Sequence, residues 1–132
     1  MEIKVTQARG KVPVSVMHVD GSIDSSTYEA FQSKADEMIQ AGTRHLLVDL
    51  EQVPLVTSAG LRALNNIFNR LRELAPDMSD EEMHKGINAG TYKSPHLKLL
   101  KPSKATTLAL EHSGFSMFIE SFADLKSAID SF

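Results

Sequence analysis

Two stretches near the start of the chain alternate apolar and polar residues, which is the pattern of strands in a half-buried sheet. The first stretch is Ile3–Gln7 and the second is Val12–Val19. Pro13 cannot donate to a strand ladder, so we expect it at the start of the second strand. The two strands should pair as a hairpin through residues 9–11. Because the second strand is apolar on both faces, we expect it in the interior of the sheet.

Further along, apolar residues recur at intervals of three and four, which is typical of amphipathic helices. The first such segment begins near Ser26, at capping-box spacing from Glu29, and ends at Gly42. A buried strand over residues 44–50 follows, and then a second helix from Ser58 to about Leu74. Its predicted buried residues are the following: Leu61, Leu64, Phe68 and Leu71.

The last third of the chain repeats the alternation of strand and helix. We expect a strand at His96–Leu100 and a helix that opens at Pro102–Ser103 and stops at Gly114. A short strand or extended piece at Phe115–Ile119 and a final helix capped by Ser121 complete the prediction. Strands and helices that alternate after a hairpin indicate an α/β fold with a mixed sheet and crossover helices.

About twenty residues, 75–95, separate the second helix from the next strand. Ser79 is a possible cap for a short helix, but Gly86 and Gly90 limit its length. A structureless segment of this length is uncommon in a compact domain unless it is mobile or functional. We expect a flexible surface loop without a role of its own; the alternative is a contact with a specific partner.

Length and composition exclude several classes of protein. The chain has 132 residues, which fits one domain over residues 1–132, and its net charge is −3 without a basic run, so nucleic-acid binding is not indicated. No apolar run is long enough to span a bilayer, and the N-terminus lacks the apolar core of a signal peptide, so we expect a cytoplasmic protein without a direct membrane contact. The absence of cysteine excludes disulfides and thiol catalysis.

Motifs for metals, cofactors and catalysis are missing. The five histidines do not stand at metal-ligand spacings, so we expect no zinc site. They are His18, His45, His84, His96 and His112. No glycine-rich phosphate loop is present, and Val56 stands where a nucleophile elbow around Ser58 needs its first glycine. We therefore expect no cofactor and no enzymatic activity.

Ser58 stands where the chain passes from a buried strand into a helix. The start of a helix has unpaired N–H groups and a partial positive charge, so it accommodates an oxygen or an anion. A phosphate on Ser58 would therefore not unfold the helix. The alternative is that Ser58 is only an N-cap, a role that Thr57 fills equally well.

The residues around Ser58 resemble the signature of STAS domains, the anti-sigma factor antagonist family. That signature is an Asp-Leu pair, a short connection, and Asp-Ser-Ser-Gly-Leu. The pair matches Asp49-Leu50, and the second part matches Thr57–Leu61, with threonine for the aspartate and Ala59 for the second serine. The family's phosphorylated serine falls on Ser58. A further element of the family before its first helix, Gly-x-Leu/Ile-Asp, matches residues 21–24.

This resemblance covers nearly the whole chain and implies a STAS-like single domain. Its fold is a small mixed β-sheet with about four helices largely on one face, and residues 75–95 are an insertion atypical of the family. The implied function is that of an anti-sigma factor antagonist that binds a kinase-type anti-sigma factor, a serine-protein kinase, and is released by phosphorylation of Ser58. The implied contact surface comprises Gly21, Ser22, Ile23, Asp24, Val56, Thr57, Ser58, Ala59, Gly60 and Leu61.

A second hypothesis keeps the fold and removes the switch. STAS-like domains also occur as constitutive scaffold or regulatory subunits of signalling assemblies and lipid-transport complexes. The threonine in place of the family aspartate and the insertion at 75–95 favour this alternative. An enzyme that uses Ser58 as a nucleophile would need a nearby base, and no pairing in the sequence nominates one.

Overall fold

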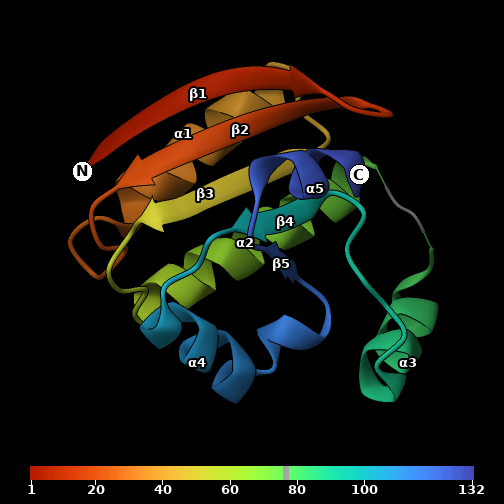
Figure 1. Ribbon diagram of the computed structural model, residues 1–132. Helices are drawn as coiled ribbons and strands as arrows, with labels where there is room; N and C mark the ends of the chain where they lie inside the picture. The colour runs from red at the N-terminus through yellow and green to blue at the C-terminus, as the bar shows by residue number, and fades with distance from the viewer. Residues whose placement is uncertain (76–77) are drawn as a thin grey trace.

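The computed structural model describes residues 1–75 and 78–132, and its centre is a five-stranded sheet with the order β1-β2-β3-β4-β5 (Figure 1). The strands are β1 (Glu2–Arg9), β2 (Pro13–Asp20), β3 (Leu46–Gln52), β4 (Leu97–Leu100) and β5 (Glu120–Phe122). β1 is antiparallel to β2, and the other neighbours are parallel, so the sheet is mixed as expected. Parallel pairs need crossover connections, which the helices between the strands provide.

The predicted hairpin and the interior position of its second strand are confirmed. β1 and β2 pair without a break from Glu2 opposite Asp20 to Arg9 opposite Pro13, and β2 pairs with β3 on its other side. The two faces of β2 are both buried. Met17 lies in the large cluster on one face of the sheet, and Val16 lies in a smaller cluster on the other face.

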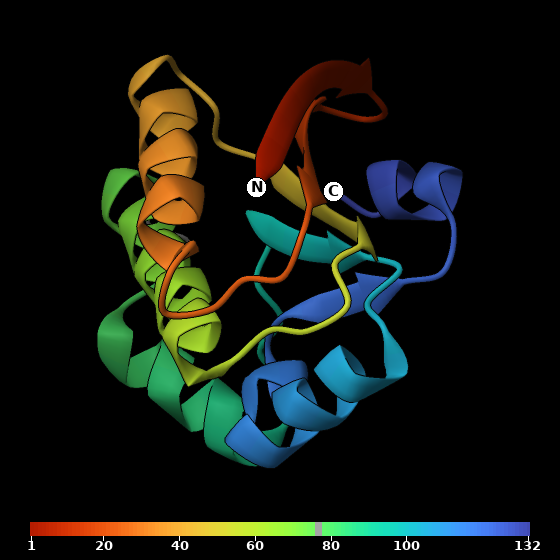
Figure 2. The same ribbon diagram turned by 90° about the vertical axis from the view of Figure 1, so that its left-hand side faces the viewer.

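Helices cover the two faces unequally (Figure 2). In the described residues there are five α-helices: α1 (Tyr28–Gln40), α2 (Ser58–Leu74), α3 (Asp80–Ala89), α4 (Lys104–Ser113) and α5 (Leu125–Asp130). The first four contribute buried side chains to the large cluster, whereas α5 packs on the opposite face. The expected architecture is thus confirmed, with one helix more than expected and one helix alone on the second face.

The second helix agrees closely with its prediction. It runs from Ser58 to Leu74, and Leu64, Phe68 and Leu71 are buried as expected. Arg72 is not among the predicted buried residues, yet it is buried, with 8% of its surface exposed. Its guanidinium donates to Asp80 Oδ1 at 2.8 Å and to the Met78 carbonyl at 2.9 Å, so the buried charge is paired with a carboxylate at the surface.

The start of α1 differs from the predicted capping box. The N-cap is Thr27, and its side chain makes no capping hydrogen bond. Instead the Asp24 carboxylate accepts from the Ser26 N–H at 2.9 Å and from the Ser26 hydroxyl at 2.6 Å. The aspartate therefore forms the turn itself, and Ser26 lies one residue too early to cap the helix.

The expected loop over residues 75–95 is wrong for residues 80–89, which form the helix α3 (Asp80–Ala89). Residues 76 and 77 of this segment lie outside the described residues. The Ser79 side chain accepts from the Glu82 N–H at 3.2 Å, and Gly90 ends the helix with a φ of 75°. Gly90 is thus the terminal residue of a helix in the left-handed conformation that glycine adopts most easily.

Three details near the end of the chain also differ from expectation. Residues 115–117 form a short 3₁₀ turn, so the last strand starts at Glu120. Asp124, not Ser121, caps α5, and its carboxylate accepts from the Ser127 N–H at 2.9 Å. The start and stop of α4 at Ser103 and Gly114 agree with prediction. Apolar spacing predicts Leu108 and Leu110 on the buried side of this helix, but only Leu110 is buried, and Thr106 is buried where Leu108 is exposed.

Candidate functional site

Two loops at the carboxyl ends of β2 and β3 are joined by backbone hydrogen bonds. We call residues 21–24 and 53–57 the loop pair. The Ile23 N–H donates to the Leu55 carbonyl, and the Thr57 N–H donates to the Ile23 carbonyl, each at 3.0 Å. An isolated parallel bridge links Ile23 and Val56, whose side chains are 0% and 2% exposed. These two side chains cannot touch a partner, so they position the loops that carry their neighbours.

Gly60 allows α2 to approach the loop pair. A Cβ at this position would lie 2.6 Å from the Ile23 carbonyl oxygen and 2.7 Å from Val56 Cγ1. Real Cβ atoms do not come so close to a backbone oxygen, so a side chain at residue 60 would push the helix away from the loops. The glycine in the signature is thus explained by the close contact of two backbones.

Ser58 is the first residue of α2, and its side chain is exposed to solvent. Its hydroxyl makes no hydrogen bond with any other described residue. The N-cap position belongs to Thr57, which has no capping hydrogen bond from its side chain, and the Thr57 hydroxyl lies 3.4 Å from the Ile23 carbonyl. The hydroxyl of Ser58 is therefore not used to cap the helix, and it is reachable from solvent at the positive end of the helix dipole.

The remaining predicted contact residues lie around Ser58 with different exposures. Gly21 has a φ of 116°, which only glycine adopts without strain, and its N–H donates to the Gln52 carbonyl at 3.0 Å. Ala59 and Leu61 are half-buried, and Leu61 packs against the large cluster. The surface that the loop pair offers beside Ser58 is therefore partly backbone.

Ser22 and Asp24 are half-buried at the start of the loop pair. The Ser22 carbonyl accepts from the Thr27 hydroxyl at 2.7 Å. Hydrogen bonds from the side chain and the backbone N–H of Ser26 hold the pKa of the Asp24 carboxyl below its ordinary value. This carboxylate therefore stays ionised near neutral pH and puts a negative charge at the edge of the predicted contact surface.

Asp49, which matches the aspartate of the Asp-Leu pair, has its carboxylate fully engaged. Its Oδ2 accepts from Nδ1 of His18 at 2.8 Å, and its Oδ1 accepts from the Glu51 N–H at 3.0 Å. Nε2 of His18 in turn accepts from the Thr6 hydroxyl at 2.9 Å. This chain of bonds crosses β1, β2 and β3, so Asp49 fixes the alignment of the strands that lead into the loop pair.

Two residues beside this site escaped the sequence analysis. Leu55 in the β3–α2 connection is 46% exposed, which places an apolar side chain on the surface close to Ser58. The Ser103 hydroxyl donates to the Pro54 carbonyl at 3.1 Å and so attaches the start of α4 to the same connection. An apolar residue directly after a proline in a connection was the only signal for Leu55, and the sequence held none for the bond from Ser103.

Metal ligation and membrane insertion have no counterpart in the part of the chain that the structure describes. No three histidine or acidic side chains there come together as a metal site would require. None of the helices over residues 1–75 and 78–132 has the length and apolar character to cross a bilayer.

The His45 pKa is lowered by burial, despite the opposing effect of a hydrogen bond to the Pro95 carbonyl, so this imidazole is neutral at pH 7.

Solved structures with the same fold include several proteins connected with sigma-factor control. A protein from Thermotoga maritima, provisionally assigned as an anti-sigma factor antagonist, has 12% identity and a TM-score of 0.69, with 96% of this chain and 92% of that chain covered. An anti-sigma factor antagonist from Mycobacterium paratuberculosis has 18% identity and a TM-score of 0.67, with coverage of 97% and 92%. At these identities the likeness shows the fold.

SpoIIAA provides two further comparisons. The anti-sigma factor antagonist SpoIIAA in its unphosphorylated form has 15% identity and a TM-score of 0.62, with coverage of 98% of this chain and 96% of that chain. The phosphorylated form of SpoIIAA, a Bacillus cell fate determinant, has 16% identity and a TM-score of 0.64, with coverage of 98% and 97%. Both forms therefore align over nearly their whole length.

Sequence comparison gives the family directly. No curated protein matches the chain in sequence. The family model of the STAS domain, in contrast, matches residues 5–78, which is more than half of the chain and includes both loops, Ser58 and the whole of α2. Together with the fold, this match shows that the chain belongs to the STAS domain family.

Proposed function

We propose that the protein is a non-enzymatic, cytoplasmic anti-sigma factor antagonist whose binding is switched off by phosphorylation of Ser58. In the unmodified state the loop pair and the start of α2 bind a kinase-type anti-sigma factor, which is thereby kept from its sigma factor. Transfer of a phosphoryl group to the Ser58 hydroxyl breaks this complex. The proposal is supported by the family and by structural likeness to anti-sigma factor antagonists.

The observation that carries the proposal is the state of Ser58. Its side chain is exposed, makes no hydrogen bond with the described residues, and stands at the first position of a 17-residue helix. A hydroxyl that caps a helix is held in a hydrogen bond to the backbone, whereas this one is free to approach the phosphoryl donor of a kinase. The likeness to SpoIIAA, which has been solved in phosphorylated and unphosphorylated forms, agrees with this interpretation.

Phosphorylation would act on the complex more than on the free protein. A phosphate adds about −1.5 to −2 charges and a bulky tetrahedral group, which the free N–H groups and dipole of a helix start tolerate. A docked partner surface has to desolvate and accommodate the same group. A loss of about 3 kcal/mol at this interface would weaken binding more than a hundredfold.

The test combines a kinase assay with a binding assay. Kinase-type anti-sigma factors from the same genome are purified and incubated with the full chain and ATP, and peptide mass spectrometry should place the phosphate on Ser58. The Ser58→Asp variant should bind its kinase at least about a hundredfold more weakly than the unchanged chain. Ser116→Asp, which changes another exposed serine on the short 3₁₀ turn, is the matched control and should bind normally.

Two results would overturn the switch. One is phosphate found only at other residues, and the other is unchanged affinity of Ser58→Asp. A stable stoichiometric complex that is indifferent to Ser58→Asp would instead establish the second candidate, a constitutive scaffold or regulatory subunit of a larger assembly. The observation that favours this candidate is α3, all of which lies beyond the part of the chain matched by the family model.

A further inference from the structure

The two edges of the sheet differ in length and protection. β1 is an edge strand of eight residues, and its register with β2 is continuous over all of them. β5 at the other edge has only three residues. Long edge strands are usually protected by proline, by a bulge or by a covering segment, because their unpaired backbone groups can bind another strand. β1 contains neither a proline nor a bulge.

The backbone groups of β1 that face outward can be assigned from its neighbour. The Ser15 N–H donates to the His45 carbonyl on the β3 side of β2, so Ser15 and its partner Gln7 form a non-hydrogen-bonded pair of the β1–β2 ladder. The N–H and carbonyl of Gln7 therefore point away from β2. Because this pattern repeats every second residue, the same groups of Ile3 and Val5 also point outward.

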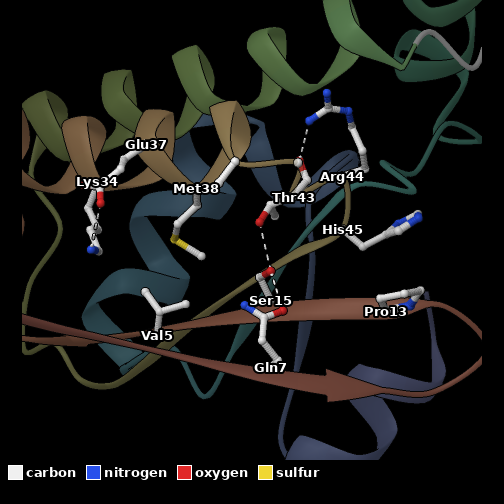
Figure 3. Close-up of a pocket in the computed structure, with 12 residues that line it drawn as sticks. Val5, Gln7, Pro13, Ser15, Lys34, Glu37, Met38, Thr43, Arg44 and His45 are labelled. Carbon is white, nitrogen blue, oxygen red and sulfur yellow. Dashed lines mark hydrogen bonds and ion pairs between the residues drawn. The ribbon is translucent and has the colours of Figure 1, made fainter.

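A slot runs beside two of these residues, Val5 and Gln7, on the inner face of β1. It has a volume of about 580 Å³ and lies between β1 and β2 on one side and the carboxyl-terminal half of α1 on the other (Figure 3). Val5 and Met38 point into it from opposite sides, and Lys34 lies at its rim. Ser15 is buried, with 6% of its surface exposed, and its hydroxyl donates to Gln7 Oε1 at 3.0 Å. This hydrogen-bonded pair forms the floor of the slot.

A single added strand could use both the outward backbone groups of β1 and the slot. A strand that is added to β1 would hydrogen-bond to Ile3, Val5 and Gln7. Residues directly opposite each other in a sheet point their side chains to the same face, so every second side chain of the added strand would enter the slot between β1 and α1. An extended segment thus finds both backbone partners and a place for its side chains.

Charge distinguishes between possible occupants of this edge. Residues 2–11 carry three basic side chains, Lys4, Arg9 and Lys11, against the single acid Glu2, so the net charge is +2 in a chain of net charge −3. A second copy of β1 would bring two such positive segments together, which is unfavourable. An acidic strand would be attracted instead.

We propose that the β1 edge, with the slot beside α1, binds an extended acidic segment of a partner protein by β-strand addition. The bound segment alternates side chains that fill the slot against Val5 and Met38 with side chains that lie on the opposite face near Lys4. Ser58 follows the carboxyl end of β3, whereas the slot is lined by residues at the amino-terminal ends of β2 and β3, so filling of the slot does not depend on the proposed phosphoswitch.

Binding is tested with two synthetic peptides and the ¹⁵N-labelled full chain. The first is an acetylated and amidated peptide of about nine residues that alternates glutamate and valine, which matches the length of the edge. The second replaces each glutamate with lysine. Titration with the acidic peptide should shift the amide signals of Ile3, Val5 and Gln7 and slow their hydrogen exchange, whereas Lys4 and Thr6, already bonded to β2, should change less. The lysine peptide should bind at least about tenfold more weakly.

Variants of the chain show whether the edge itself is responsible. The double variant Lys4→Glu/Arg9→Glu should weaken the acidic peptide about tenfold, and Lys104→Glu/Lys126→Glu, with the same charge change on α4 and α5, should not. Val5→Pro removes an outward N–H and should abolish binding; should this variant fail to fold, the charge reversal alone decides. Equal affinity for both peptides, absence of shifts at β1, or a dimer formed through β1 would overturn the proposal.

The Ser58→Asp variant should bind the acidic peptide with the same affinity as the unchanged chain.

Discussion

The loop pair and α3 lie beside the same large cluster but are held in different ways. The loop pair is fixed by backbone hydrogen bonds, by the buried side chains of Ile23 and Val56, and by the close approach of α2, where a Cβ at Gly60 would collide with the Ile23 carbonyl. In α3 the only buried residue is Met83, and the bonds from Arg72 to residues 78 and 80 tie its start to α2.

This contrast suggests that the two regions have different stabilities. Regions with few buried apolar contacts open at a lower free-energy cost than the core of the domain. Residue 58 lies on the rigid region. The protein cannot move locally to relieve a charge added there, so the added charge changes the binding of a partner directly. α3 should respond first when the protein is stressed. Four changes test this comparison, starting with the largest expected effect.

Gly60→Ala tests the rigid region. Helix propensity alone would make this substitution stabilising by about 1 kcal/mol. The added Cβ would lie 2.6 Å from a backbone oxygen, which cannot move away as a flexible side chain would. We therefore expect a loss of about 2 kcal/mol in the free energy of unfolding, measured by urea denaturation. Asn66→Ala, an exposed change on the same helix, should stay within about 0.5 kcal/mol, and a stabilised Gly60→Ala would contradict the close packing.

Arg72→Met tests the tie between α2 and α3. The substitution keeps most of the apolar stem but removes the donors to Asp80 and to the Met78 carbonyl. We expect a loss of about 1 kcal/mol in stability and faster hydrogen exchange in α3 than in the loop pair. The control is Lys85→Met, which breaks only the exposed pair with Glu81 and should have almost no effect. Uniform acceleration of exchange across the domain would show that α3 is not a separate unit.

Acid should loosen α3 before the loop pair. The hydrogen bond and then the charge of Arg72 hold the pKa of Asp80 below its ordinary value of 3.8. A carboxyl with a depressed pKa in the folded state stabilises the fold above the unfolded pKa, and this contribution is lost as the pH falls through the folded pKa. Asp24 gives the loop pair a similar contribution, because its pKa is also lowered. Since α3 has fewer buried apolar contacts to hold it when such a contribution is lost, amide exchange measured from neutral pH to below 3.8 should show α3 opening first. Asp80→Asn should remove this pH dependence in α3, and identical midpoints for both regions would argue against it.

Ser58→Asp should have the smallest effect on the free protein. A carboxylate in the first turn of a helix interacts favourably with the helix dipole, so we expect a gain of roughly 0.3 kcal/mol at low ionic strength. Thermal unfolding at two salt concentrations measures this gain and its screening. Asn66→Asp in the middle of α2 is the control and should not gain. A clear loss of stability in Ser58→Asp would mean that the helix start does not tolerate negative charge.

Periodicity was enough to predict most of the fold. The hairpin, α1, α2 and the two-faced character of β2 follow from apolar spacing, because a sheet and its covering helices bury regular faces. The end of α4 was also correctly placed, since Gly114 adopts a φ of 82° there. In the segment 75–95, Ser79 and Gly90 were recognised as a possible cap and a limit of a short helix, yet a loop was preferred, whereas the structure has a helix between them.

The missed features have two causes. Some depend on contacts between residues that no local pattern connects, and others depend on a choice between two neighbouring residues that could both cap a helix. The buried Arg72 is paired with Asp80, which lies eight residues later in the chain, and no periodic pattern encodes this pairing. Ser121 and Asp124 are both good capping residues, and the placement of β5 decides between them. At the candidate site, the exposure of Ser58 was expected from its position, but the bonds that join the loop pair could be found only in the structure.

The second cluster of the sheet has a consequence for synthesis of the protein. Val14 and Val16 in the first hairpin are covered by Ala128 and Ile129 of α5, and Lys98 secures that helix by donating to the Ser131 carbonyl at 2.8 Å. The ribosome releases the hairpin long before α5. The face of the hairpin that carries Val14 and Val16 is therefore exposed to water until residues 128–129 have been synthesised and released. Contacts of such long sequence separation form late, and a chaperone has that interval in which to bind the hairpin.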